Sequence, residues 1–235
     1  MRHIAVILAR GGSKRLPRKN ILEIHGQPMI VWTIRAALDS GCYHRVLVST
    51  DDEEIAAISR SAGAEVPFLR DSATDDIAPS TAATLAALQQ AELHWGEHYD
   101  VVSQLMANCP LRGADEIRDA VDNFRNSGTK FQISCFRFGW MNPWWAARLN
   151  DRGEPEYLFP EARTQRSQDL PPLHCPSGAI WIANCESLRR SETFYGPGHI
   201  LHPMPWIAAL DIDDADDFAM ARACFPVTLS AGAQR

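Results

Sequence analysis

The chain has 235 residues, 46% of them hydrophobic, which is enough to bury the core of one large domain. Its formal net charge of −6 and pI near 5.7 argue against a general nucleic-acid or membrane-surface binder. The longest apolar runs are too short to span a membrane, and the first predicted strand begins too early for a signal peptide. The six cysteines show no C-x-x-C pair and no disulfide-like clustering, so we expect a soluble, cytoplasmic protein with reduced thiols.

The elements expected along the chain alternate between buried strands and amphipathic helices. A strand over 3–9 precedes a basic loop, and a helix then runs from Pro28 to the stop at Gly41. Asp51 and Asp52 are placed to cap the helix that follows the second strand. This alternation predicts an α/β domain with a parallel sheet. The strands are expected at 3–9, 45–50, 99–105, 131–138, 179–183 and 206–210, and the later helices at 81–95, 114–124 and 215–224.

Residues 139–177 interrupt this alternation. The segment begins with GWMNPWW, is rich in Pro, Arg and Gln further on, and has little regular periodicity. Such an excursion inside an α/β domain is usually functional or an oligomer contact. For its three tryptophans, an intersubunit or substrate-side role and plain core packing both remain open.

The loop after the first strand concentrates positive charge in an acidic protein. It holds two of the chain's three lysines, and we expect Arg10, Lys14 and Lys19 to neutralise a polyphosphate. Gly11 and Gly12 would let the backbone turn there. Neither G-x-x-x-x-G-K-[ST] nor G-x-G-x-x-G is present, which disfavours a Walker-type ATPase and a dinucleotide dehydrogenase. The alternative is a solvated basic turn.

Two aspartates near the other end of the chain form a candidate metal site. Asp211 and Asp213 follow an apolar stretch at spacing i, i+2, which in extended backbone projects both carboxylates to one side. Such a pair can hold one hard cation, and Mg²⁺ is the natural partner of a polyphosphate. The competing interpretation is that Asp213 or Asp214 caps the last helix.

Several stretches, in order over nearly the whole chain, resemble the acylneuraminate cytidylyltransferase family. They are ILARGGSKRLPRKN with GQPMIVWTI, VSTDDEEIAAISRSAGAEVPFLR (48–70), CPLR (109–112), RSQDLPPL (166–173) with PSGAIWI (176–182), and DID (211–213).

The resemblance implies a single domain over 1–235 with the nucleotide-diphospho-sugar transferase (Rossmann-like) fold, three layers around a mixed, mostly parallel sheet. Residues 139–177 would be a dimerisation and sugar-side insertion that reaches toward the neighbouring active site of a homodimer. The reaction would join CMP from CTP to the anomeric 2-hydroxyl of a nine-carbon 3-deoxy-2-ulosonic acid, with Mg²⁺, and release pyrophosphate.

The resemblance also assigns roles residue by residue. Arg10 and Lys19 would be catalytic by stabilising the triphosphate in the transition state. Asp211 and Asp213 would hold Mg²⁺. The nucleotide-binding residues would be Gly11, Gly12, Ser13, Lys14, Asn20, Arg70 and Ser80, and the sugar-side residues Arg166 and Gln168.

The chain departs from the family at two places. Met106 stands where many members have a glutamine, so Asn108 is the candidate to contact the edge of the base instead. No lysine follows Lys130, so an arginine, Arg163 or Arg166, would have to meet the sugar carboxylate. The acceptor is therefore left open between sialic acid and a legionaminic- or pseudaminic-type relative. The alternative functions are a nucleotidyltransferase that uses another nucleotide or sugar and a non-catalytic nucleotide-binding protein.

Overall fold

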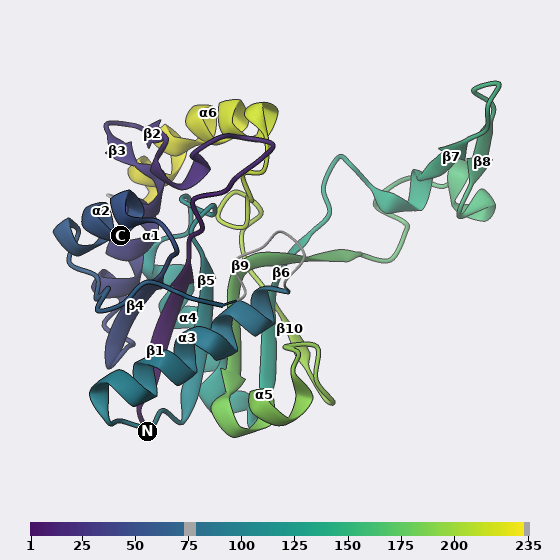
Figure 1. The fold of residues 1–235 in the computed structure, drawn as a ribbon. Helices are drawn as coiled ribbons and strands as arrows, with labels where there is room; N and C mark the ends of the chain where they lie inside the picture. The colour runs from purple at the N-terminus through teal and green to yellow at the C-terminus, as the bar shows by residue number, and fades with distance from the viewer. Residues whose placement is uncertain (73–78, 233–235) are drawn as a thin grey trace.

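The centre of the molecule is a six-stranded sheet. The computed structural model describes residues 1–72 and 79–232. Within this sheet, the strand pairs are parallel except those of β9, which runs antiparallel to both of its neighbours (Figure 1). The predicted mixed, mostly parallel sheet is therefore confirmed. The strand order is β10 (Ile200–Pro203), β6 (Phe131–Arg137), β9 (His174–Asn184), β5 (Val101–Met106), β1 (His3–Leu8) and β4 (Arg45–Ser49).

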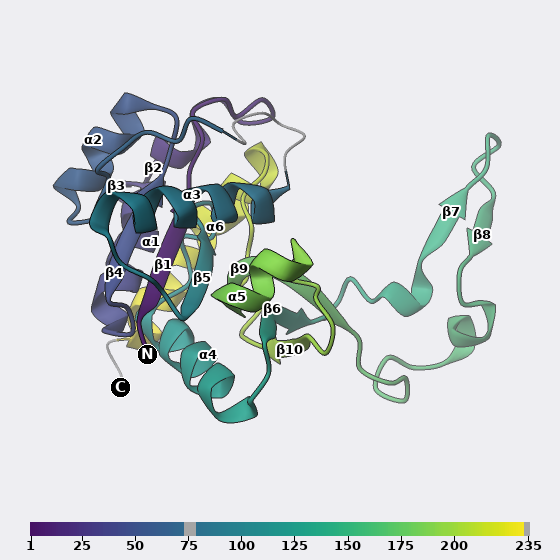
Figure 2. The same cartoon turned by 60° about the horizontal axis from the view of Figure 1, so that its bottom comes forward.

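Helices cover both faces of this sheet and make a three-layer molecule. Along β1, Ala5 and Ile7 point into one hydrophobic cluster and Ile4 and Val6 into the other, because successive side chains of a strand face opposite ways. Figure 2 shows the strands between α3 and α4. The first cluster is covered by α1 (Met29–Ser40), α2 (Glu53–Ser61) and α4 (Ala114–Ser127), and the second by α3 (Ser80–Trp95) and α5 (Cys185–Ser191).

The last helix, α6 (Ala215–Gly232), packs outside the sheet. It lies over a small hairpin of β2 (Glu23–Ile24) and β3 (Gln27–Pro28), which follows the 3-10 turn η1 (Lys19–Ile21). Phe225, Ile24 and Ile212 belong to a third buried cluster there. This packing brings the C-terminal part of the chain against the loop that follows β1.

The helix ends follow local sequence signals where these were predicted. The Asp52 side chain accepts a hydrogen bond from the Ile55 amide and caps α2. Gly41 ends α1 in the left-handed conformation, with φ of 65°.

One predicted strand is wrong. Residues 206–210 form a turn, in which the Ala209 amide donates to the carbonyls of Pro205 and Trp206, at 3.1 and 3.2 Å. The strand lies earlier, at β10, which pairs with β6. Pro205 lacks an amide hydrogen, and an apolar run of five residues does not by itself distinguish a strand from a buried turn.

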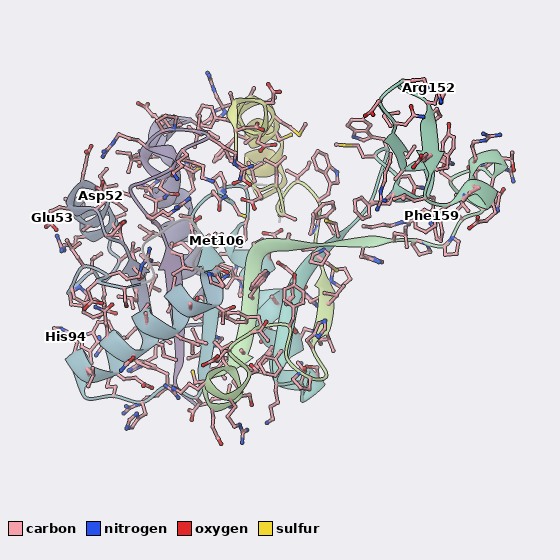
Figure 3. The ribbon with its side chains drawn as sticks, turned by 45° about the vertical axis from the view of Figure 1, so that its right-hand side comes forward. Asp52, Glu53, His94, Met106, Arg152 and Phe159 are labelled. Atoms are coloured by element: carbon pink, nitrogen blue, oxygen red, sulfur yellow. The ribbon has the colours of Figure 1, made fainter. Side chains whose placement is uncertain are left out.

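Between β6 and β9 the chain leaves the body as a projecting arm. This arm, residues 138–173, contains η2 (Pro143–Trp145), β7 (Ala147–Leu149), β8 (Pro155–Tyr157) and η3 (Pro160–Thr164). It extends away from the sheet in Figure 1, and Figure 3 shows Arg152 at the tip of its hairpin and Phe159 at the other end of the hairpin. Trp144 packs on Phe159 with ring centroids 4.8 Å apart, whereas Trp140 is 81% exposed. None of the helices in the described part of the chain is long and apolar enough to cross a membrane.

Candidate active site

A cavity of about 560 Å³ opens at the carboxyl edge of β1 and β5. Ligands of open α/β sheets bind at this edge. Met106, at the end of β5, lies at the centre of the molecule in Figure 3 and lines the cavity. Ten of the predicted site residues also line it, namely Arg10, Ser13, Lys14, Lys19, Asn20, Arg70, Ser80, Asn108, Asp211 and Asp213.

The two glycines of the basic loop differ in their surroundings. The Gly11 amide donates to Asp51 Oδ1 at 2.9 Å, and a Cβ at Gly11 would lie 2.6 Å from Asp52 Oδ2. A Cβ at Gly12 would meet no atom within 4 Å. Of these two positions, only 11 therefore requires a glycine, because the Asp52 side chain approaches its backbone closely. The amides of Gly11 and Ser13 both donate to protein oxygens, so these two amides are not available to an anion in this arrangement.

Asn20 and Arg70 form the buried wall of the cavity. Asn20 Nδ2 donates to the Arg10 carbonyl at 3.0 Å and so ties the two ends of the basic loop together. Arg70 Nη1 donates to the carbonyl and the hydroxyl of Ser49, at 3.1 and 3.2 Å. Its buried Nε has no hydrogen-bond partner among residues 1–72 and 79–232. Burial lowers the pKa of Arg70, and Asp51 opposes this effect.

The two aspartates converge on Asn108. The Asn108 Nδ2 atom donates to Asp211 Oδ1, to the Ile212 carbonyl at 3.1 Å and, weakly, to Asp213 Oδ1 at 3.5 Å. The Ile212 amide donates back to the Asn108 carbonyl at 2.9 Å. Asn108 thus anchors the acidic segment to the end of β5, and its predicted contact with the base stays a prediction.

Asp211 and Asp213 are in different electrostatic environments. Burial, reinforced by the neighbouring Asp213, raises the pKa of Asp211 to about 6. Burial would also raise the pKa of Asp213, but hydrogen bonds from Lys19 and Arg15 outweigh it and lower that pKa. Lys19 Nζ lies 2.8 Å from Asp213 Oδ1, and Arg15 Nη2 lies 2.5 Å from Asp213 Oδ2.

The capping interpretation of the aspartates is settled by Asp214. Its Oδ1 accepts from the amides of Asp216 and Asp217, both at 3.0 Å, at the start of α6. Asp214 therefore caps the helix, and Asp213 faces the cavity.

The carboxylate pair fits a small divalent cation. Oxygens of Asp211 and Asp213 approach one and the same nitrogen of Asn108, so both are within reach of a single ion at this place. Within residues 1–72 and 79–232, no group of three or more His, Cys, Asp or Glu side chains could hold a metal. An ion would thus take two protein ligands and complete its shell with water and substrate oxygens, as Mg²⁺ does at phosphates.

The predicted sugar-side residues lie elsewhere, on the arm. Arg166 forms an ion pair with Asp169, at 2.7 Å, and the Arg163 guanidinium stacks 5.2 Å from the centre of the Tyr157 ring. Gln168 lies in the same exposed stretch. None of the three lines the cavity of its own chain.

Sequence reasoning missed Arg15 as a lining residue. It lies within the quoted stretch ILARGGSKRLPRKN, but the resemblance assigns it no role, and its partner Asp213 is 198 residues away. Cys109, beside Asn108, is fully buried, and burial raises the pKa of its thiol, which makes it a packing residue and a poor nucleophile.

Comparisons with known proteins agree with this geometry. The family described as Cytidylyltransferase matches residues 4–139. The chain is 33% identical to the pseudaminic acid cytidylyltransferase of Campylobacter jejuni over 97% of both chains. It is 34% identical to the CMP-N,N'-diacetyllegionaminic acid synthase of Legionella pneumophila over 94% of both.

Solved structures support the fold. The structure of CMP:2-keto-3-deoxy-manno-octonic acid synthetase with CTP superposes with a TM-score of 0.68 at 17% identity, over 96% of this chain and 99% of that one. A cytidylyltransferase from Leptospira borgpetersenii gives 0.58 at 17% identity, over 97% and 87%. The resemblance found in the sequence is confirmed, and the chain belongs to the cytidylyltransferase family.

Proposed function

We propose that the protein transfers CMP from CTP to the anomeric 2-hydroxyl of a nine-carbon 3-deoxy-2-ulosonic acid and releases pyrophosphate. The observation that carries this proposal is the cavity at the carboxyl edge of β1 and β5, where a basic loop faces a carboxylate pair. The relatives named for pseudaminic and diacetyllegionaminic acid match 94% or more of the chain, so an acid of that type is the proposed acceptor.

The residues of the cavity supply positioning and charge neutralisation, which is most of what phosphoryl transfer asks of a protein. Arg10, Lys14 and Lys19 would bind the triphosphate, and Arg70 would extend the nucleotide pocket. Asp211 and Asp213 would hold Mg²⁺, which, when bound, neutralises charge on the phosphates. The sugar hydroxyl would then attack the α-phosphorus, the new O–P bond forming as the bond to pyrophosphate breaks.

We propose that the sugar-side residues act from the partner subunit of a homodimer. Arg163, Arg166 and Gln168 lie on the projecting arm, away from the cavity of their own chain. The arm also exposes large apolar side chains, among them Trp140 and Leu149, which a second copy could bury. A cytoplasmic location is proposed on two grounds, the use of CTP and six unpaired cysteines.

The experiment is pyrophosphate release with Mg²⁺, with each of the four nucleoside triphosphates tested against a panel of nine-carbon ulosonic acids and one eight-carbon acid. Release with CTP and one nine-carbon acid is the expected outcome. Release with another nucleotide would contradict the cytidine assignment while keeping the transferase. Folded protein that binds CTP and releases no pyrophosphate with any acid would favour a non-catalytic nucleotide binder.

A further inference from the structure

Arg15 and Lys19 share one carboxylate in the structure. Lys19 Nζ contacts one oxygen of Asp213, at 2.8 Å, and Arg15 Nη2 contacts the other, at 2.5 Å. The Lys19 side chain is only 15% exposed and the Arg15 side chain 67%. Both oxygens of Asp213 are therefore occupied by cations that line the same cavity.

This arrangement conflicts with the other role of Asp213. A divalent cation that binds Asp213 must take an oxygen that now accepts from Lys19 or Arg15. The ion carries two positive charges, so Lys19 and Arg15 lose their attraction to the carboxylate once it is bound. Both residues line the cavity, so the triphosphate of a nucleotide bound there could replace the carboxylate as their partner.

We propose that Asp213 is an exchange point, and that Arg15 is a further triphosphate-binding residue. In the metal-free protein Arg15 and Lys19 neutralise Asp213, and the divalent cation takes the carboxylate and releases both side chains to the phosphates. Metal and nucleotide therefore bind cooperatively through one side chain, and by linkage each increases the affinity for the other. The inference rests on the proposed function, because it needs CTP and Mg²⁺ as ligands of this cavity.

The test is the dissociation constant of CTP, measured calorimetrically without sugar, once in EDTA and once in excess Mg²⁺. In the wild type, we expect Mg²⁺ to strengthen CTP binding about tenfold or more. Asp213→Asn should bind metal-free CTP about fivefold more tightly than the wild type, because Lys19 and Arg15 are no longer held. For this variant, the increase in CTP affinity on adding Mg²⁺ should fall to about threefold or less.

A matched control separates exchange from simple loss of negative charge. Asp216→Asn removes one exposed carboxylate from the same segment, three residues along the chain, and should behave as the wild type does. Arg15→Gln should weaken CTP binding in Mg²⁺ about fivefold, because a triphosphate contact is lost. Asp213→Ser serves as a second variant should Asp213→Asn fail to fold.

Two results overturn the inference alone, both with CTP still bound by the wild type. One is that Asp213→Asn and Asp216→Asn bind metal-free CTP equally well. The other is that Arg15→Gln binds CTP in Mg²⁺ as tightly as the wild type. Failure of the wild type to bind CTP even with Mg²⁺ would overturn the proposed function and the inference together.

Discussion

At the scale of single residues, the two carboxylates of the cavity differ in what surrounds them. Asp211 lies beside Asn108, and desolvation together with the negative charge of Asp213 raises its pKa. Asp213 is neutralised by two cations. A bound cation would therefore stabilise the charge of Asp211 more than that of Asp213, so substitution of Asp211 is the more direct test of the proposed metal site.

Asp211→Asn should abolish turnover while preserving the fold. An amide keeps the size and the hydrogen-bond acceptor that faces Asn108, but it loses the charge that would hold Mg²⁺. We expect pyrophosphate release to fall at least about a hundredfold, with the melting temperature of the metal-free protein retained. Asp216→Asn is the control and should release pyrophosphate at the wild-type rate. A fully active Asp211→Asn enzyme would remove Asp211 from the metal site.

Gly11→Ala and Gly12→Ala should have different effects on stability. The new methyl group at Gly11 would lie 2.6 Å from Asp52 Oδ2, so the cap of α2 or the loop has to move, whereas at Gly12 the space is open. We expect Gly11→Ala to lower the free energy of unfolding by about 1–3 kcal/mol and Gly12→Ala to change it by less than about 0.5 kcal/mol. Urea denaturation of the two variants measures this. Equal effects would contradict the steric account.

At the scale of elements, the sequence correctly predicted those strands and helix ends that are determined by a few neighbouring residues. The apolar run of β1, Gly41 at the end of α1 and Asp52 at the start of α2 are short-range signals, and all three are found. The turn at 206–210 follows Pro205, and its apolar composition alone could not distinguish it from a strand.

The candidate site was predictable to the same extent. The basic loop is contiguous in sequence, and its position at the carboxyl end of the first strand followed from general rules. The contacts of Asn108 with Asp211 and of Arg15 with Asp213 join residues 103 and 198 positions apart. Such pairs depend on how α6 packs over the loop, which no periodicity in the sequence encodes.

The arm is the element whose role is most directly testable. Trp140 and Leu149 are 81% and 71% exposed on it, and a partner subunit would bury such side chains. The double substitution Trp140→Ser and Leu149→Ser should therefore convert the proposed homodimer to monomers and lower turnover by about tenfold or more. Light scattering after size-exclusion chromatography gives the mass. Leu93→Ser, at a 78% exposed position on α3, is the control and should stay dimeric.

At the scale of the whole molecule, stability should depend on pH through a buried histidine at the start of β1. His3 begins β1 and is buried, and its Nε2 lies 2.8 Å from the Ser103 hydroxyl oxygen of β5. Burial, with a smaller contribution from the positive charge of Arg125, lowers the pKa of His3 to about 3. The unfolded chain binds this proton near its usual pKa of about 6.5.

Between those two pKa values the unfolded state binds a proton that the folded state excludes, so stability falls as the pH falls from 6.5 toward 3. At pH 4.5 the loss from His3 amounts to about 3 kcal/mol, at about 1.4 kcal/mol per pH unit. His3→Gln keeps a polar group near Ser103 without a titrating proton, and its free energy of unfolding should decline less steeply over this range. His98→Gln, at a side chain that is 96% exposed, should keep the wild-type slope. Equal slopes for all three proteins in urea titrations between pH 4.5 and 7 would show that His3 is protonated without cost in the folded sheet.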